Sequence, residues 1–362
     1  MLKPVENVIR SKFIPALCEN RPCGKFDRDL LSLPVKLGGL GIHDITVTSN
    51  IEFETSTNAT QNITQKIIHQ NDIKNHSIAK KEFQSKAMYF NELHQQLKTI
   101  TNPQQVKANG IACSDGASIW LSTLPLKKEK FSLTKREFYD AINLRYGWQF
   151  KNLPNNCVCG KSFSVDHSMS CKVGGLIILR HNELVDVTTD LLSTVCKDVI
   201  KEPTLQSTPD SSNDLRADIS VRGFWEKLQR AFLDVRVFYP FAPSYFNQSL
   251  GTSMKAMEKS KKRKYNQRVL DGENGTFTPL IFSSNGGMSK ETKRFYSRLS
   301  ELISEKQNVD YSTASSWFKR KLSFSLLRTT VICIRGSRSR KYNVPTADVV
   351  GDLEVANEIC QI

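Results

Sequence analysis

The hydrophobic positions of the chain follow a helical period in several long segments. Apolar residues recur at every third or fourth position over 78–100, 176–200, 289–306 and 312–334. This spacing gathers apolar side chains on one face of a helix. Each of these segments is therefore predicted to be an amphipathic helix that packs against the rest of its domain.

A second pattern, typical of β-strands, fills three shorter runs. LRADISV (215–221), AFLDVRVFY (231–239) and FTPLIFS (277–283) are rich in β-branched and aromatic residues. A strongly basic helix is predicted at 254–270, between the second and third runs. From residue 176 onward the order is helix, strand, strand, helix, strand, helix, which predicts an α/β (α+β) layer fold.

The segments before residue 156 are predicted to be mainly helical. LSLPVKLGGLGIHD contains a glycine-rich turn between two packed helices, and its spacing fits neither the Walker nor the dinucleotide pattern. The polar residues 50–75 indicate a linker, and STPDSSND marks a loop at 207–214. Ser132 or Thr134 is expected to cap a further helix, in which Phe138, Ala141, Ile142 and Leu144 form the buried stripe.

The charge of the chain points to a polyanionic partner. Its 362 residues carry 51 Lys and Arg against 36 Asp and Glu, a formal net charge of +15. Nucleic acid is the default partner of such a protein, and a basic solvated surface is the alternative. No apolar run is long enough for a membrane span, and the start MLKPVENVIRSKF does not resemble a secretory signal.

Three of the nine cysteines and one of the six histidines lie within one short segment. Cys157, Cys159, His167 and Cys171 supply sulfur and nitrogen ligands of the kind that zinc binds tetrahedrally. Gly160 suits a tight turn after the second cysteine, although the C-x-C pair is closer than most zinc motifs. A structural zinc knuckle is the main interpretation, and a reduced loop without metal is the alternative. Cys196 and Cys333 are expected to be core residues.

Two acidic residues lie inside predicted strands. Asp218 belongs to RADISV and Asp234 to FLDVRV, and Gly223 with Glu226 and Lys227 suits a hairpin turn between them. An antiparallel hairpin would place the two carboxylates close together on one face, where they could bind Mg²⁺. The alternative is that both face solvent on an edge strand.

The basic helix offers the cation that phosphodiester cleavage needs. Glu258, Lys261, Lys262 and Tyr265 have the spacing of one helix face, so either lysine could approach a phosphate, and the sequence does not rank them. Residues 226–268 hold ten Lys and Arg against three Asp and Glu, which favours contact with a nucleic-acid backbone. The run KSKKRK (259–264) also fits a nuclear-localisation patch.

Upstream, the helix at 176–200 opens with Arg180-His181-Asn182-Glu183. Glu183 could add a carboxylate to a metal, and His181 could contact phosphate. A structural role for His181 is an equal alternative.

In this order, the motifs resemble the C-terminal part of non-LTR retrotransposon proteins. The thumb of these proteins is resembled by LPVKLGGLGI, and their linker by IWLSTLPL and FSLTKREFYDAINLRYG. The start of their basic-His-acidic helix is resembled by RHNE. RAD at 216–218 and Asp234 stand at the two acids of a PD-(D/E)XK nuclease, and the helix ending in Lys264-Tyr265 resembles its migrated lysine helix. Ala217 stands in place of the family's proline, and Arg236 in place of the lysine of D-x-K.

The resemblance implies the following organisation: a thumb-like remnant at 1–48, a polar linker and long helix at 49–110, a helical linker at 111–156, a CCHC zinc knuckle at 157–175, a restriction-like endonuclease domain at 176–310, and a C-terminal helix with a basic tail at 311–362. The chain has no Tyr-X-Asp-Asp motif, so no reverse transcriptase activity is expected from it.

The resulting hypothesis is a nuclear, Mg²⁺-dependent DNA endonuclease with a structural Zn²⁺. Its expected catalytic residues are Asp218, Asp234, Lys261, Lys262 and Glu183. Its expected nucleic-acid contacts are His181, Arg180, Arg236, Lys259, Arg263, Lys264 and Tyr265. A non-catalytic protein that binds DNA or RNA is the first alternative, and a decayed element product without selected activity is the second.

Overall fold

The computed structural model describes residues 2–70, 82–100, 102–206 and 215–338. The chain divides into two compact units, one of residues 1–114 and 142–148 and the other of residues 115–141 and 149–362. Within the described residues, no helix combines the length and hydrophobicity needed to cross a membrane. The predicted loop at 207–214 and the basic tail from 339 onward lie outside the described residues.

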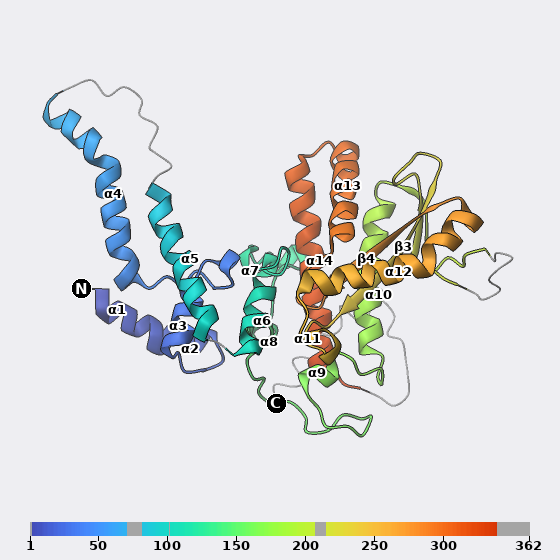
Figure 1. Ribbon diagram of the computed structural model, residues 1–362, viewed down its shortest axis with the longest axis horizontal. Coiled ribbons are helices and arrows are strands. Elements are labelled where there is room, and N and C mark those ends of the chain that lie inside the picture. The colour runs from blue at the N-terminus through green and yellow to red at the C-terminus, as the bar shows by residue number, and fades with distance from the viewer. Residues whose placement is uncertain (1, 71–81, 101, 207–214, 339–362) are drawn as a thin grey trace. The chain divides into compact units, whose positions relative to one another are not determined.

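The first unit is helical. It contains α1 (Leu2–Val8), a π-helical turn (Ile9–Phe13), α2 (Ile14–Leu17), α3 (Lys25–Ser32), a 3₁₀ turn (Val35–Leu37), α4 (Ile45–Ile68), α5 (Glu82–Ile100) and α6 (Pro103–Ala112). In Figure 1, α4 and α5 run side by side as two long helices. The predicted helix at 78–100 is confirmed by α5, except for its first residues, 78–81, which lie outside the described part of the chain.

The glycine-rich turn between α3 and α4 is confirmed. Gly38 has a φ of +90°, which favours glycine. A Cβ atom on Gly39 would lie 1.9 Å from the carbonyl oxygen of Leu33, so a side chain at this position is excluded. The close backbone approach explains why the segment needs consecutive glycines.

The predicted linker at 50–75 is wrong over most of its length, because α4 continues to Ile68. Asp44 caps this helix by accepting a hydrogen bond from the amide of Thr46 at 2.9 Å. Threonine hydroxyls along α4 donate to carbonyls one turn back, as from Thr64 to Thr60. Residues 71–75 lie outside the described residues.

The second unit combines helices with a four-stranded sheet. It contains α7 (Ile119–Ser122), a 3₁₀ turn (Lys127–Glu129), α9 (Val165–Ser168), α10 (Leu176–Ser193), β1 (Lys197–Lys201), β2 (Ile219–Arg222), β3 (Arg230–Phe238), α11 (Pro243–Phe246), α12 (Leu250–Glu273), β4 (Thr276–Ser283), α13 (Lys290–Gln307) and α14 (Tyr311–Arg335). Helix α8 (Lys135–Tyr146) begins in this unit and ends in the first. Thr134 is its cap, since its hydroxyl accepts the amide of Glu137 at 3.2 Å.

The strand order is β1-β2-β3-β4, with antiparallel pairs except for the parallel β3–β4 pair. The α/β class is therefore confirmed, and the three predicted strands form β2, β3 and β4. The last residues of the predicted helix at 176–200 are strand β1 instead. In Figure 1, α12 crosses the strands β3 and β4.

Side chains alternate between the two faces of β3. Leu233 and Val235 join the main core with residues of α10, α13 and α14. Phe232 and Phe238 pack with residues of α12 on the other side. Because neighbouring strand residues point to opposite faces, Asp234 belongs to the α12 side. Helix α14, expected as a separate segment, is part of the main core through Phe318 and Leu322.

Candidate functional site

The hairpin formed by β2 and β3 brings the two acidic residues together. Its antiparallel register ends at the pair of Ile219 and Leu233, so Asp218 comes directly before this pair on one strand and Asp234 directly after it on the other. The Asp218 amide donates to the carbonyl of Leu233 at 3.0 Å. One carboxylate oxygen of Asp218 accepts the amide of Val235 at 2.5 Å, so this side chain reaches the residue next to Asp234.

Asp234 is the more buried acid, with 3% of its surface exposed. Burial raises the pKa of its carboxyl group, and the nearby charge of Asp218 adds to that rise, although Lys261 and Tyr265 counteract both. Its Oδ2 atom is buried and accepts no well-directed hydrogen bond. The ammonium group of Lys261 lies 2.5 Å from this oxygen, as an ion pair.

Each acid has a basic partner from a different helix. Lys261 of α12 pairs with Asp234, and His181 of α10 lies with its Nε2 atom 3.3 Å from Oδ1 of Asp218. Burial alone would lower the pKa of His181, but the hydrogen bond and the charge of Asp218 outweigh it and the pKa is raised. Two carboxylates, a lysine and a histidine thus meet at one place in the second unit.

The two candidate lysines have different partners. Lys262 pairs with Glu291 at the start of α13, at 2.9 Å, and Glu258 accepts the amide of the same residue. The four residues that were expected on one helix face therefore have two sets of partners. Glu258 and Lys262 contact Glu291, whereas Lys261 and Tyr265 lie at Asp234. Of the two candidate lysines, Lys261 is the one that contacts an acid of the hairpin. The sequence did not distinguish between them.

Three expected site residues have other surroundings. Glu183 accepts a hydrogen bond from Ser325 of α14 at 2.9 Å, and since residues two apart on a helix do not share a face, it does not join His181. Arg180 is 3% exposed and contacts Met169. Tyr265 is also 3% exposed and donates to the carbonyl of Arg216. Burial leaves neither of the last two a surface for nucleic acid.

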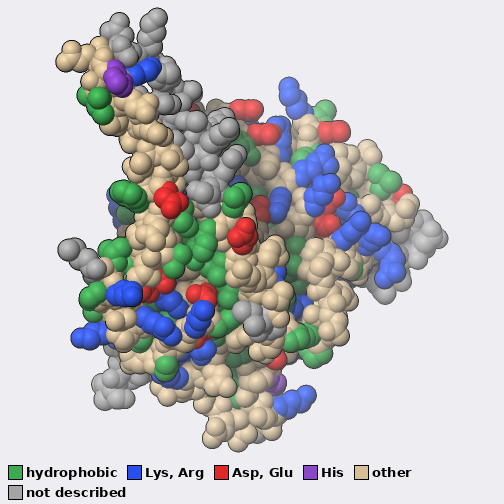
Figure 2. Space-filling view, turned by 60° about the vertical axis from the view of Figure 1, so that its left-hand side comes forward, with side chains coloured by type: hydrophobic (Ala, Val, Ile, Leu, Met, Phe, Trp, Pro, Cys, Tyr) green, Lys and Arg blue, Asp and Glu red, His purple; other side chains and the backbone are tan. Residues whose placement is uncertain are grey.

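The remaining expected nucleic-acid contacts reach the surface. Lys259, Arg263 and Lys264 are exposed on α12. Arg236 lies on the same side of β3 as Asp234, two residues on, and its guanidinium donates to the hydroxyl of Tyr245 at 3.3 Å. Lys and Arg side chains also recur across the face drawn in Figure 2.

The four metal-ligand candidates form a cluster. One ligand atom of each of Cys157, Cys159, His167 and Cys171 lies within 4.8 Å of the others. The Sγ atoms of Cys157 and Cys171 are 3.8 Å apart, and Cys159 Sγ lies 3.3 Å from Nε2 of His167. Tetrahedral zinc with sulfur at about 2.3 Å requires about 3.8 Å between two sulfurs. The cluster can therefore bind a metal ion such as zinc.

Local hydrogen bonds explain how this short segment holds its ligands. Gly160, at a φ of +87°, closes a turn in which its amide donates to the carbonyl of Cys157 at 2.9 Å. Ser164 caps the one-turn helix α9 by accepting the amide of His167. The amide of Cys171 then donates to the carbonyl of His167. The turn and the helix thus bring both ligand pairs to one point.

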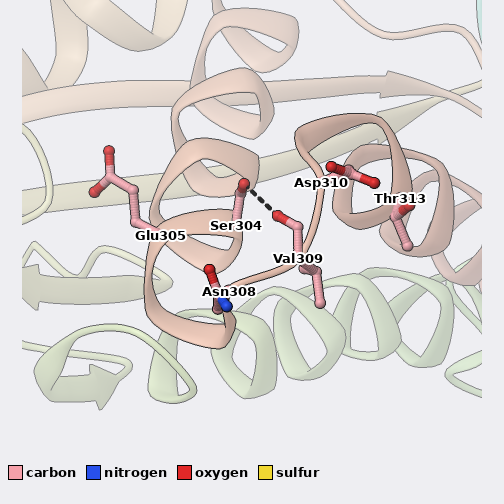
Figure 3. Close-up of a pocket in the computed structure, with 6 residues that line it drawn as sticks. All are labelled: Ser304, Glu305, Asn308, Val309, Asp310 and Thr313. Atoms are coloured by element: carbon pink, nitrogen blue, oxygen red, sulfur yellow. Dashed lines mark hydrogen bonds between the residues drawn. The ribbon is translucent and has the colours of Figure 1, made fainter.

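A surface hollow lies elsewhere in the second unit. Figure 3 shows it between the end of α13 and the start of α14, lined by Ser304, Glu305, Asn308, Val309, Asp310 and Thr313. Neither acid of the hairpin lines this hollow. Its side chains offer no lysine or arginine for a phosphate, so it does not change the choice of site.

The hydrogen bond from the backbone amide of Val235 to Asp218 could not be predicted from the sequence. Every residue other than proline carries a backbone amide, so no residue type marks this donor.

A comparison with models of known protein families finds no match. A comparison with curated proteins finds none either.

Proposed function

We propose that this protein is a metal-dependent DNA endonuclease of the restriction-like type, related to the C-terminal part of non-LTR retrotransposon proteins. The observation that carries the proposal is the proximity of three side chains: Asp218 accepts the amide of Val235, next to Asp234, and Lys261 pairs with Asp234. A buried acid pair is unfavourable unless a cation offsets it, and such pairs with a lysine are suited to phosphodiester cleavage.

The two carboxylates fit a divalent ion. Asp234 Oδ2 is buried without a well-directed donor, and the carboxylate of Asp218 lies against the next residue along β3. Carboxylate oxygens are the ligands that Mg²⁺ prefers. Mg²⁺ held there would lower the pKa of a bound water and neutralise charge on the phosphate.

The chain's own cations would complete the site. Lys261 would exchange Asp234 for a phosphate oxygen and stabilise the charge that develops during attack. His181 would keep the carboxylate of Asp218 oriented. Arg236, on the same side of β3, would contact the neighbouring phosphate. Glu183 has no part in this proposal because it is bound to Ser325.

The cluster of Cys157, Cys159, His167 and Cys171, called the Cys157–Cys171 cluster below, would have a structural role and no part in cleavage. We propose that it holds a structural Zn²⁺, since four protein ligands leave no open position for a reacting water. The basic run at 259–264 would direct the protein to the nucleus, where its DNA substrate lies.

The test is a supercoiled-plasmid nicking assay with and without Mg²⁺. The wild type should nick the plasmid only with the metal, and Asp218→Ala and Asp234→Ala should abolish nicking. Asp190→Ala, an exposed acid of α10, is the matched control and should retain activity. Equal nicking by all four proteins would reject the proposal.

A nucleic-acid-binding protein without cleavage is the second candidate. It is favoured by the exposed residues Lys255, Lys259 and Arg263, whose spacing of four places them on one side of α12. Binding without nicking would support it. Each Lys→Gln change there should then reduce the slope of log K against log salt by about 0.9, for double-stranded DNA. Lys306→Gln, on α13, should leave the slope unchanged.

A further inference from the structure

The loop at 157–171, which holds the four metal-ligand candidates and is called the metal-binding loop below, contacts the helix that carries His181. Arg180 of α10 is 3% exposed, and its guanidinium contacts the loop at one residue, Met169. One terminal nitrogen lies 3.2 Å from the Met169 sulfur and the other 3.3 Å from the Met169 carbonyl oxygen. Met169 itself lies between two of the ligands, His167 and Cys171.

Arg180 is unusual because its charge is buried without a carboxylate. Among the described residues, the titratable group that acts on it is the thiol of Cys333, and its Nε atom makes no hydrogen bond. Burial lowers the pKa of its guanidinium. A buried cation of this kind is unfavourable unless an anion compensates it. Nothing in the hydrogen bonds to Met169 supplies that negative charge.

The ligand set can supply the charge. Three thiolates and one imidazole around a Zn²⁺ ion carry a net negative charge, and the segment that Arg180 contacts joins two of these ligands. Groups around a metal site commonly orient its ligands and compensate its charge. Arg180 is therefore placed to respond to occupation of the cluster.

The next residue along α10 is His181, which pairs with Asp218 at 3.3 Å. A continuous helix, Leu176–Ser193, holds the two side chains in a fixed relation. We propose that metal binding at the Cys157–Cys171 cluster positions His181 against Asp218, and that Arg180 is the positioning residue that transmits this effect.

The meaning of His181 in this inference rests on the proposed nuclease function, but its test requires no cleavage. The full chain is labelled with ¹⁵N-histidine, loaded with zinc, and studied by ring ¹H–¹⁵N correlation spectra without Mg²⁺ or DNA. His181→Gln assigns the signal of His181. Asp218→Asn supplies the reference spectrum for a His181 that has lost its partner.

Chelation of zinc from the wild type should move the His181 signal toward the Asp218→Asn position, while circular dichroism reports a folded protein. Arg180→Met should cause the same shift with zinc still bound, and Arg180→Lys should reverse part of it. Arg338→Met is the matched control, because Arg338 donates to Ser168 of the same loop at 3.3 Å but does not belong to α10. Its His181 signal should stay in the wild-type position.

A His181 signal that stays unchanged on chelation of the wild type would overturn the inference. The same conclusion follows if Arg180→Met keeps both its zinc and the wild-type signal. If Arg180→Met loses zinc, the wild-type chelation experiment alone decides. A protein that fails to nick DNA but shows the shift would contradict the proposed function and leave the inference standing.

Discussion

At the scale of single residues, the proposed site contains two acids, each with a different basic partner. Asp234 is buried with Lys261, whereas Asp218 is held by the amide of Val235 and by His181. In the proposed nuclease, this difference would give the two acids different roles. Asp234 has a carboxylate that a metal would stabilise strongly, and Asp218 has one whose orientation is fixed in advance.

Substitution of the two adjacent lysines should have unequal effects. Lys261→Met is expected to reduce nicking by about 100-fold, the loss typical of one stabilising group, whereas Lys262→Met should cost less than about threefold. The reason is that Lys262 pairs with Glu291 and not with an acid of the hairpin. Single-turnover rates on plasmid DNA measure both, and equal losses would argue against the assigned site.

Asp234→Asn should raise the melting temperature of the protein in the presence of a chelator. Burial and the charge of Asp218 raise the pKa of this carboxyl group, so its ionised form opposes folding at neutral pH. The gain should be full above the raised pKa and should shrink as the pH falls from there to the ordinary pKa of aspartate, below which the carboxyl is neutral in the folded and the unfolded state. Calorimetry between neutral and acidic pH measures it. A lower melting temperature at neutral pH would contradict this account.

Single-residue roles could be predicted where the strand pattern itself carried the information. The alternation in RADISV and FLDVRV predicted that both acids belong to one hairpin, and β2 and β3 do pair as an antiparallel hairpin. The burial of individual polar side chains could not be predicted from the sequence pattern. Arg180 and Tyr265 looked like surface cations and aromatics but are enclosed by tertiary contacts. No sequence pattern distinguishes Glu183 bonded to Ser325 from Glu183 at a metal.

At the scale of elements, the metal-binding loop contains little structure of its own beyond one turn and α9. Such a segment depends on its metal for folding. The buried residues Ser168 and Met169 connect it to the rest of the second unit. Loss of the metal should therefore release the loop without unfolding the sheet.

Cys171→Ser should lose the bound zinc and open the loop to trypsin at two exposed lysines, Lys161 within the ligand segment and Lys172 directly after it. Cys196→Ser, outside the cluster, should retain zinc and resist cleavage at both sites. Metal analysis and mass spectrometry of the fragments measure this. Identical cleavage patterns for the two variants would show that the metal does not hold the loop.

Elements were predictable where their pattern was strong. Strands β2, β3 and β4 and helices α12, α13 and α14 follow the hydrophobic periods of the sequence. Strand β1 was missed because Lys197–Lys201 is mostly exposed and forms only by pairing with β2. Helix α4 was taken for a linker because its polar residues give it no clear apolar face.

At the scale of the whole molecule, the second unit depends on one enclosed ion pair between distant parts of the sequence. Asp140 of α8 is fully buried, and both of its oxygens accept from Arg335 at the end of α14, at 2.9 and 2.8 Å. This contact joins residues 195 positions apart. It secures the helix that closes the main core.

Arg335→Met should reduce the free energy of unfolding by about 3–5 kcal/mol, because it leaves the carboxylate of Asp140 buried and unpaired. Arg298→Met removes an exposed pair with Glu301 and should cost less than about 1 kcal/mol. Urea titration of both variants measures the difference. Similar losses would show that the pair of Asp140 and Arg335 has no special weight.

The most direct test of the account is a Mn²⁺ titration of the zinc-loaded protein, followed by electron paramagnetic resonance. The wild type should bind a Mn²⁺ ion that both Asp218→Asn and Asp234→Asn fail to bind, while Asp190→Asn binds it normally. Binding that is the same in all four proteins would contradict the claim that these two carboxylates form a metal site.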